Sequence, residues 1–325
     1  MAANVVPARP SALMRRGGTS RSQMRQRAFW LFITPWIMGF VFLTSLPLIL
    51  GLATSLTNFD GLNLPTLKFV GANNYVRALQ DEEVAYSLGR TAIFTLSAVP
   101  LMLVFSMTLA VILNQDVRYR GAFRTILYIP YVIPVVAGTW AWKLIADKNV
   151  GLINALISEV SPGFAVNWLG DHATIILVAY STWAAAGGGM IIFLAGLQGI
   201  PTELREAAMI DGATPWRTFR SIVLPLMTPV VFFQLIMGII GALQTFVQAI
   251  LLAPARTGGA AMETLPARPN MLFMAYDYVQ IFIKHRFGYG TALLWIMFVI
   301  VLLLTLVVFF SERYWVYYET EGGKK

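Results

Sequence analysis

The sequence contains no cysteine and only two histidines, and only 12% of its 325 residues are charged. The absence of cysteine excludes a disulfide framework and a thiolate metal site. His172 and His285 lie far apart in predicted loops, so we expect surface histidines and no metal. A soluble domain carries about twice this charged fraction. With 57% hydrophobic residues and a mean hydropathy of +0.67, the composition predicts an integral membrane protein.

Sequence features of ATPases, ion-coupled carriers and membrane enzymes are also absent. No G-x-x-x-x-G-K-[ST] phosphate loop occurs, so the chain lacks this device for holding ATP. No aspartate or glutamate falls inside a predicted span, whereas proton- and sodium-coupled carriers usually keep one there. An intramembrane enzyme needs clustered acids, histidines or an activated serine, and the spans hold no such cluster. These absences disfavour a stand-alone secondary carrier and an enzyme, and we expect no catalytic residue, metal or cofactor on this chain.

Six apolar segments approach the length of about 20 residues that a bilayer core requires. They predict an all-α fold with spans over Phe29–Ala53, Thr91–Leu113, Ala122–Leu144, Thr174–Leu197, Leu226–Leu252 and Thr291–Phe310. Residues 1–28 hold six arginines and no acid, which predicts a disordered cytoplasmic tail. The expected organisation is this tail, a six-span domain over 29–311 and a cytoplasmic C-terminal tail over 312–325.

The distribution of lysine and arginine predicts the orientation of the spans. With the N-terminus inside, the basic residues gather in the N-terminal tail, the loop at 114–121, the segment at 201–225 and the C-terminal end. The opposite loops are longer in sum and hold fewer basic residues. The positive-inside rule therefore predicts that 201–225 and both termini are cytoplasmic. Membrane orientation explains the net charge of +8 better than nucleic-acid binding does.

The charged segment between the fourth and fifth spans reads as two short helices. Pro201 suits the first turn of a helix, and Glu203 and Glu206 lie near its start, where the helix dipole favours anions. Gly212 can end this helix because glycine enters the left-handed conformation without steric cost. The first helix is therefore predicted between Pro201 and Gly212.

The second helix of this hairpin begins with an N-cap threonine, Thr214, followed by a first-turn proline. We expect Trp216 and Phe219 to pack it against the chain's own spans and Pro225 to end it. Two short helices on a membrane surface form either a docking element for a partner or a hairpin that packs on its own spans. The pattern alone leaves both open.

The residues of this hairpin resemble the EAA signature of ABC importer permeases. E-A-A stands at Glu206–Ala208, D-G-A at Asp211–Ala213 and L-P at Leu224–Pro225, with Phe219 and Ile222 at the expected offsets. Other stretches are similar to landmarks of the MalF-like carbohydrate uptake family (oligosaccharide/glycerol-phosphate type). They are F-V-G-A-N-N-Y at Phe69–Tyr75, F-R-T-I-L-Y-I-P at Phe123–Pro130, G-L-I-N at Gly151–Asn154, L-A-G-L-Q-G-I-P at Leu194–Pro201, F-G-Y-G-T-A at Phe287–Ala292 and W-V-Y-Y-E at Trp315–Glu319.

The resemblance covers almost everything after residue 29 and implies a six-span type I ABC importer permease with a cytoplasmic coupling helix. Such a subunit forms half of a path for an oligosaccharide in the bacterial cytoplasmic membrane. It works with a second, homologous permease, two ATPase subunits that hold ATP and magnesium, and an extracytoplasmic solute-binding protein. The ATPase-coupling residues implied are Glu203, Glu206, Ala207, Ala208, Asp211, Gly212 and Ala213. Another solute such as glycerol phosphate stays open, although a phosphate needs a basic residue and only Lys143 comes near a span.

Polar and aromatic residues in the fourth and fifth spans are candidates for the substrate path. A sugar needs aromatic faces and amide or hydroxyl groups, and an unsatisfied amide in a membrane costs a few kcal/mol. Gln244 and Gln248 are four residues apart and are expected on one helical face. Bridging between helices is the alternative role for such side chains. The candidates are Tyr180, Trp183, Gly188, Gln234, Gln244, Thr245 and Gln248.

Two prolines, Pro130 and Pro134, interrupt the third predicted span. Each removes a backbone hydrogen bond, so we expect both to kink the helix. A hinge and a fixed bend are both compatible with the sequence.

Overall fold

The structure, a computed structural model, describes residues 18–63, 65, 67–116, 118–163, 165–253 and 266–318. Within these ranges the regular elements are helices, with one isolated antiparallel bridge between Thr57 and Phe69. The chain divides into two compact units, Met1–Thr54 and Ser55–Lys325, which are described separately.

The first unit is one long apolar helical segment. It contains α1 (Gly18–Gly39), a π-helical stretch η1 (Phe40–Ser45) and the body of α2 (Leu46–Ser55). Gln23–Ser55 is long and apolar enough to cross a membrane, in agreement with the first predicted span. The predicted tail boundary at residue 28 falls inside α1, and residues 1–17 lie outside the described part of the chain.

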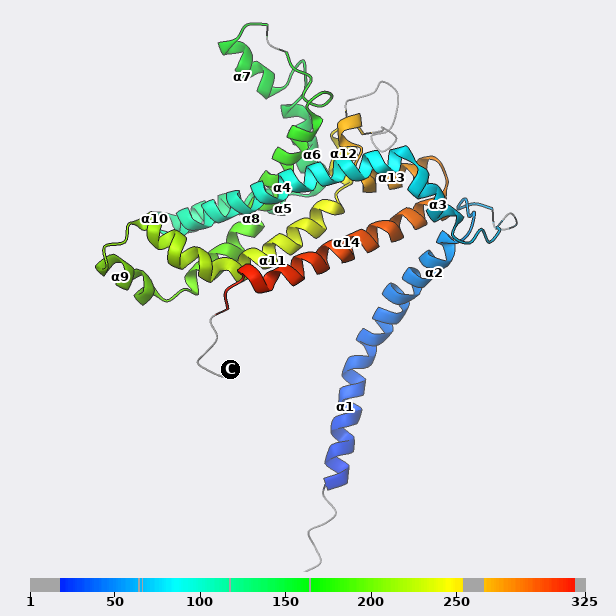
Figure 1. Cartoon of the computed structure of the whole chain (residues 1–325), viewed down its shortest axis with the longest axis horizontal. Coiled ribbons are helices and arrows are strands. Elements are labelled where there is room, and N and C mark those ends of the chain that lie inside the picture. The colour runs from blue at the N-terminus through cyan, green and yellow to red at the C-terminus, as the bar shows by residue number, and fades with distance from the viewer. Residues whose placement is uncertain are drawn as a thin grey trace, which may run out of the picture. The chain divides into compact units, whose positions relative to one another are not determined.

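The second unit is a bundle in which α4, α8, α11 and α14 lie side by side (Figure 1). The hairpin helices α9 and α10 lie at one end of the bundle and α3 at the other, while α6 and α7 project from it (Figure 1). The elements are α3 (Asn73–Gln80), α4 (Glu82–Asn114), α5 (Arg120–Val132), α6 (Val135–Ile145), α7 (Leu152–Val160), α8 (Ala173–Gln198), α9 (Thr202–Ile210), α10 (Pro215–Thr218), η3 (Phe219–Val223), α11 (Leu224–Leu243), α12 (Val247–Leu251), η4 (Arg268–Asn270), α13 (Phe273–Tyr278), η5 (Val279–Ile283) and α14 (Phe287–Trp315).

The core of the bundle consists of three apolar clusters arranged along α4, two of which also include α8. The cluster nearest the hairpin contains Met190 and Phe193 of α8 and Met227 of α11. A middle cluster joins α4 to α8 through Phe94 and Leu177. The third, at the α3 end, packs α3, α13 and α14 together. These contacts hold α8 and α11 against α4 over most of their lengths.

Five described helices are long and apolar enough to cross a membrane, and the count is six if one bent pair forms a single span. This pair is α5 and α6, whose axes differ by 95°. The third predicted span is therefore broken. Ile133 is extended (φ −63°, ψ 128°) because the ring of Pro134 disfavours helical geometry in the preceding residue. Pro130, by contrast, lies within α5 and does not end it.

The fifth predicted span is also broken. Helix α11 ends at Leu243, Gln244–Phe246 are not α-helical, and the short α12 follows. The expectation that Gln244 and Gln248 share one helical face is therefore wrong. Thr245 Oγ1 donates to the carbonyl oxygen of Gly241 at 3.1 Å, a local bond that competes with continuation of the helix.

Hydrogen bonds fasten η4, α13 and the start of α14 to the start of α4. Asp81, the N-cap of α4, accepts from the hydroxyls of Tyr276 (2.7 Å) and Tyr289 (2.8 Å) and from the backbone N–H of Glu83. Burial raises the pKa of Asp81, but the bonds to its carboxylate outweigh this effect and hold the pKa below its usual value. Arg90 of α4 donates to Pro269 O at 2.8 Å. The α3 end of the bundle is therefore fixed by polar contacts.

Candidate functional site

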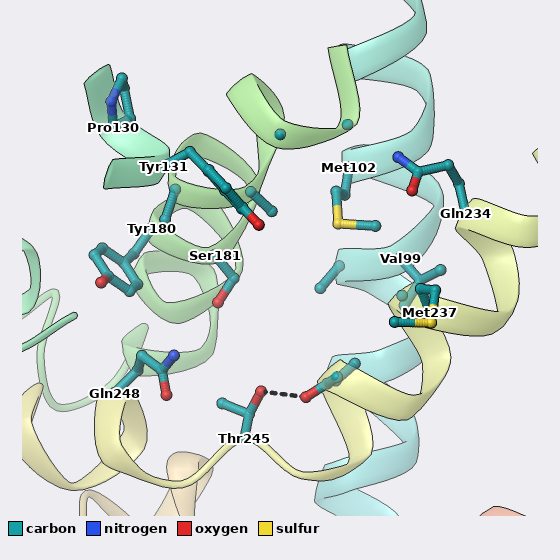
Figure 2. A pocket seen from close by; sticks show the side chains of 18 of the residues that line it. Val99, Met102, Pro130, Tyr131, Tyr180, Ser181, Gln234, Met237, Thr245 and Gln248 are labelled. Carbon is teal, nitrogen blue, oxygen red and sulfur yellow. Dashed lines mark hydrogen bonds between the residues drawn. The ribbon is translucent and has the colours of Figure 1, made fainter. Parts of the chain in front are cut away.

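A cavity of about 740 Å³ lies inside the bundle, at the level where both broken spans are interrupted (Figure 2). Its walls come from α4, α5, α6, α8 and α11, and Thr245 and Gln248 close one side. The size is that of a small-molecule site. The breaks after Val132 and Leu243 thus coincide with the space that they border.

Most residues predicted for a substrate path meet in this cavity. Its lining includes Tyr180, Gly188, Gln234, Thr245 and Gln248. Figure 2 shows the side chains of Ser181, Thr245 and Gln248 gathered on one side and Gln234 on the other.

Two predicted path residues are not part of this lining. The ring of Trp183 lies 5.8 Å from that of Trp142 and 6.2 Å from that of Tyr180, in an aromatic group next to the cavity. Gln244, directly after the end of α11, is exposed. The structure therefore separates Trp183 and Gln244 from the other five candidates.

Sequence analysis missed three polar residues of the lining: Tyr128 and Tyr131 of α5, and Ser181 of α8. Ser181 Oγ is buried and has no hydrogen-bond partner among the described residues. The two tyrosines are three residues apart and flank Pro130, so aromatic spacing beside a proline was the signal that could have found them.

Three consecutive glycines of α8 bring their neighbours close. A Cβ on Gly187 would lie 2.7 Å from Leu127 O and 2.9 Å from Tyr128 Cα, so glycine permits backbone contact between α8 and α5. A Cβ on Gly188 would meet the ring of Tyr131 at 2.7 Å. The glycines therefore set the spacing between α5 and α8 and leave room for the Tyr131 ring.

The described lining of the cavity carries no charged side chain and no histidine. Nor do the described residues contain a group of three potential metal ligands. The N-terminus of α6, at Val135, borders the cavity and supplies a positive partial charge. This dipole stabilises a bound anion by at most about 2 kcal/mol, whereas removing an ion from water costs several kcal/mol. The cavity offers hydrogen bonds to neutral groups and does not compensate a full charge.

The hairpin between α8 and α11 has the predicted helix ends. Gly212 adopts φ +75°, and its N–H donates to Met209 O while the N–H of Ala213 donates to Ala208 O. This pair of bonds is the Schellman motif, with glycine at its left-handed position. Thr214 caps α10 by accepting from the N–H of Arg217 at 3.4 Å. The left-handed glycine and the threonine cap therefore fix the turn between α9 and α10.

The hairpin presents apolar side chains to its surroundings. Met209, Ile210 and Trp216 are 63%, 87% and 70% exposed. The expectation that Trp216 packs on the chain's own spans is wrong: its ring stacks on Phe219, which alone reaches the core. A single exposed Leu or Ile is ordinary, whereas tryptophan is enriched at interaction surfaces.

The seven predicted coupling residues occupy two environments on the hairpin. Ala208 is buried and Ala213 half-buried, whereas the other five are exposed: Glu203, Glu206, Ala207, Asp211 and Gly212. The exposed carboxylates form no ion pair within the described residues. Arg205 Nη2 donates to Leu197 O at 3.1 Å and ties α9 to the end of α8. A second cavity of about 660 Å³ separates the hairpin from the end of α4.

The expectation that Pro225 ends the second helix of the hairpin is wrong. The helix is continuous from Pro215 to Leu243. The π-helical turn η3 lies directly before Pro225, which is the second residue of α11. A π turn shifts the hydrogen-bond register, so the missing N–H of the proline is accommodated there.

Comparisons with known proteins agree with this architecture. Residues 84–316 match the family of binding-protein-dependent transport system inner membrane components. The chain is 36% identical over 298 residues to the probable ABC transporter permease protein YesP of Bacillus subtilis, covering 90% of this chain and 93% of YesP. It is 33% identical over 294 residues to the trehalose/maltose transport system permease protein MalF of Thermococcus litoralis, covering 89% and 95% of the two chains.

Among solved structures, the fold matches a chain of a bacterial ABC transporter involved in the import of the acidic polysaccharide alginate. The TM-score is 0.76 at 21% identity, covering 90% of this chain and 98% of the other. At this identity the match concerns the fold alone. The expected MalF-like resemblance is confirmed, and both relatives are named as permease proteins of transport systems. The chain belongs to the family of inner membrane components of binding-protein-dependent transport systems.

Proposed function

We propose that this chain is one permease half of an ATP-driven importer for an oligosaccharide. The observation that carries the proposal is the uncharged cavity at the breaks of two spans, lined by tyrosine, serine, threonine and glutamine. Aromatic rings suit the apolar faces of a sugar, and amides and hydroxyls suit its hydroxyl groups. The trehalose/maltose permease among the relatives supports a carbohydrate as the solute.

Gln248 is the side chain that we propose to contact the sugar from this subunit, because it lines the cavity. Ser181 also lines the cavity, but its Oγ is buried as well as unpaired among the described residues. Gln234, 7% exposed, lines the opposite wall. Trp183 and Gln244 remain predictions for the part of the path that the second permease completes.

The exposed face of α9 and α10 is proposed as the docking surface for the ATPase. Glu206 is available for a charge-assisted contact with a basic group of that partner, and Met209 and Ile210 supply apolar area beside it. Ala208 is buried, so its role in this surface is to let α9 approach its own chain closely. The second permease, two ATPases with ATP and magnesium, and a solute-binding protein complete the proposed complex.

Charge reversal at Glu206 tests this docking surface. We expect Glu206→Lys to leave the complex folded but to lower the amount of sugar imported per ATP hydrolysed by at least tenfold. Glu159→Lys is the matched control, because Glu159 is an exposed acid on α7, far from the hairpin (Figure 1). Uptake and ATP hydrolysis are measured together in proteoliposomes. Normal coupling in Glu206→Lys would remove α9 from the proposed interface.

The composition of the native complex tests the function as a whole. The chain is tagged, extracted gently from its membrane and weighed by native mass spectrometry. We expect two ATPase copies and one dissimilar permease. A lone chain or a homodimer without any ATPase would contradict the proposal. Cytoplasmic positions for both termini, proposed from the distribution of basic residues, are tested by labelling engineered terminal cysteines from either side of the membrane.

A further inference from the structure

We infer that the cavity selects uncharged sugars and rejects sugars that carry carboxylate or phosphate groups. This inference rests on the proposed sugar path and goes beyond it, because the family and the fold are compatible with both kinds of solute. The fold match to an alginate importer does not predict an acidic substrate, since it carries no residue-level correspondence at 21% identity.

The composition of the cavity wall is the first argument. The lining comes from five helices and from Thr245 and Gln248, and it contains neither lysine nor arginine. Lys143 is the basic residue inside α6, but its ammonium lies 5.2 Å from the ring centroid of Trp140 and it does not line the cavity. A carboxylate that enters this space loses its water and meets no cation in the described lining.

The polar groups of the cavity give the second argument, because they suit hydroxyl groups. Ser181 Oγ is unpaired among the described residues, and Figure 2 shows it directed toward the space between Thr245 and Gln248. A primary amide and a hydroxyl each donate and accept, which matches a sugar hydroxyl that also does both. A carboxylate only accepts, so it can pair with the N–H groups of Gln248 but leaves the amide oxygen of that side chain without a donor, whereas a sugar hydroxyl can satisfy both.

The N-terminus of α6 is the one element that favours negative charge at this site. Its first residue, Val135, lines the cavity. A helix terminus stabilises an anion far less than desolvation opposes it. Its N–H groups therefore serve hydroxyl oxygens and do not reverse the preference.

The test compares matched neutral and acidic sugars on the intact permease–ATPase complex in nanodiscs, without the binding protein, so that only the membrane path selects. The probes are pools of malto-, cello- and galacto-oligosaccharides, and the same pools after oxidation of their primary hydroxyls to carboxylates. Binding is read by saturation-transfer NMR. We expect the neutral pools to bind at least tenfold better than the oxidised pools.

Two variants of one side chain separate charge from damage to the fold. Both Gln248→Lys and Gln248→Glu place one charge at the same position of the cavity. For each variant, the ratio of oxidised-pool binding to neutral-pool binding is measured. We expect this ratio to be at least tenfold higher in Gln248→Lys than in Gln248→Glu. Equal or better binding of the oxidised pools to the wild-type complex would overturn the inference and leave the sugar path standing. Binding of neither pool would contradict the sugar path itself, and the inference with it.

Discussion

Gly187 of α8 is the position where one added methyl group should disturb the cavity wall most. In Gly187→Ala the new Cβ would lie 2.7 Å from Leu127 O and 2.9 Å from Tyr128 Cα. Both atoms belong to the backbone of α5, so no side-chain rotation relieves the contact. Helix α5 has to move away from α8, and it carries Tyr128 and Tyr131 of the cavity with it.

The expected size of this effect follows from two opposing terms. Overpacking of a dense contact costs about 1–3 kcal/mol, and a clash with backbone belongs at the upper end. Alanine in place of glycine returns about 1 kcal/mol through its higher helix propensity. The net loss is about 2 kcal/mol, which lowers the melting temperature by roughly 4–8 °C at 2–4 °C for each kcal/mol.

The assay is the melting of the detergent-purified complex, followed by size-exclusion chromatography of a fluorescent fusion after heating. Gly89→Ala in α4 is the control, because a Cβ there meets nothing within 4 Å. Gly188→Ala should fall between the two, since its new Cβ meets the ring of Tyr131, which can turn. Equal melting temperatures for Gly187→Ala and Gly89→Ala would refute the close-packing argument.

Three further predictions concern other parts of the chain. Burial raises the pKa of Asp277 from 3.8 to about 8, and this side chain is only 3% exposed. Stability should therefore fall as pH rises from about 4 to 8, by up to about 1.4 kcal/mol per pH unit, and level off above that range. Asp277→Asn should flatten this dependence in melts between pH 5 and 9, and an unchanged slope would contradict it. Asp81→Ala removes the acceptor of two tyrosine hydroxyls and should cost about 1–3 kcal/mol, more than Tyr289→Phe in the same melting assay. Trp216→Ala should weaken ATPase binding about tenfold or more in a titration of the purified subunits while leaving the melting temperature unchanged; a lowered melting temperature would show that Trp216 packs on its own chain.

Features governed by local chemistry were predictable from the sequence. The fourth span, predicted over Thr174–Leu197, is the helix Ala173–Gln198. The turn of the hairpin follows from Gly212 and Thr214, because a left-handed glycine and a threonine cap act within a few residues. The bend before Pro134 belongs to the same class, although its angle of 95° does not follow from a proline alone.

Features that depend on tertiary context were not predictable. The end of α11 at Leu243 interrupts an apolar run that has no proline between Val230 and Leu252, so the sequence marked no boundary at the break. The continuation of the helix through Pro225 needs the π turn η3, which has no sequence signature of its own. Trp216 reads as a core residue by helical spacing, yet the described residues leave it 70% exposed.

The cavity was predictable in part. Glutamines inside an apolar span point to a polar lining because an unsatisfied amide is costly in a membrane, and Gln234 and Gln248 do line it. Tyr128 and Tyr131 carry no such signal, since tyrosine is common in spans for several reasons. Gln244 shows the limit of periodicity: helical spacing placed it beside Gln248, and the break after Leu243 separates the two side chains.

The connectivity of the hairpin explains how motion at its surface would reach the cavity. Gly188 of the cavity wall lies about 15 Å along α8 from the end of this helix at Gln198, at 1.5 Å per residue. Gln234, in another wall of the cavity, lies about 28 Å along the continuous helix from its first residue, Pro215. Since α9 and α10 are the direct link between these helices, displacement of the hairpin acts on both walls along two helix axes. In the coupling that we propose, the two helices would transmit this displacement as stiff rods, and the longer of them contains the π turn η3.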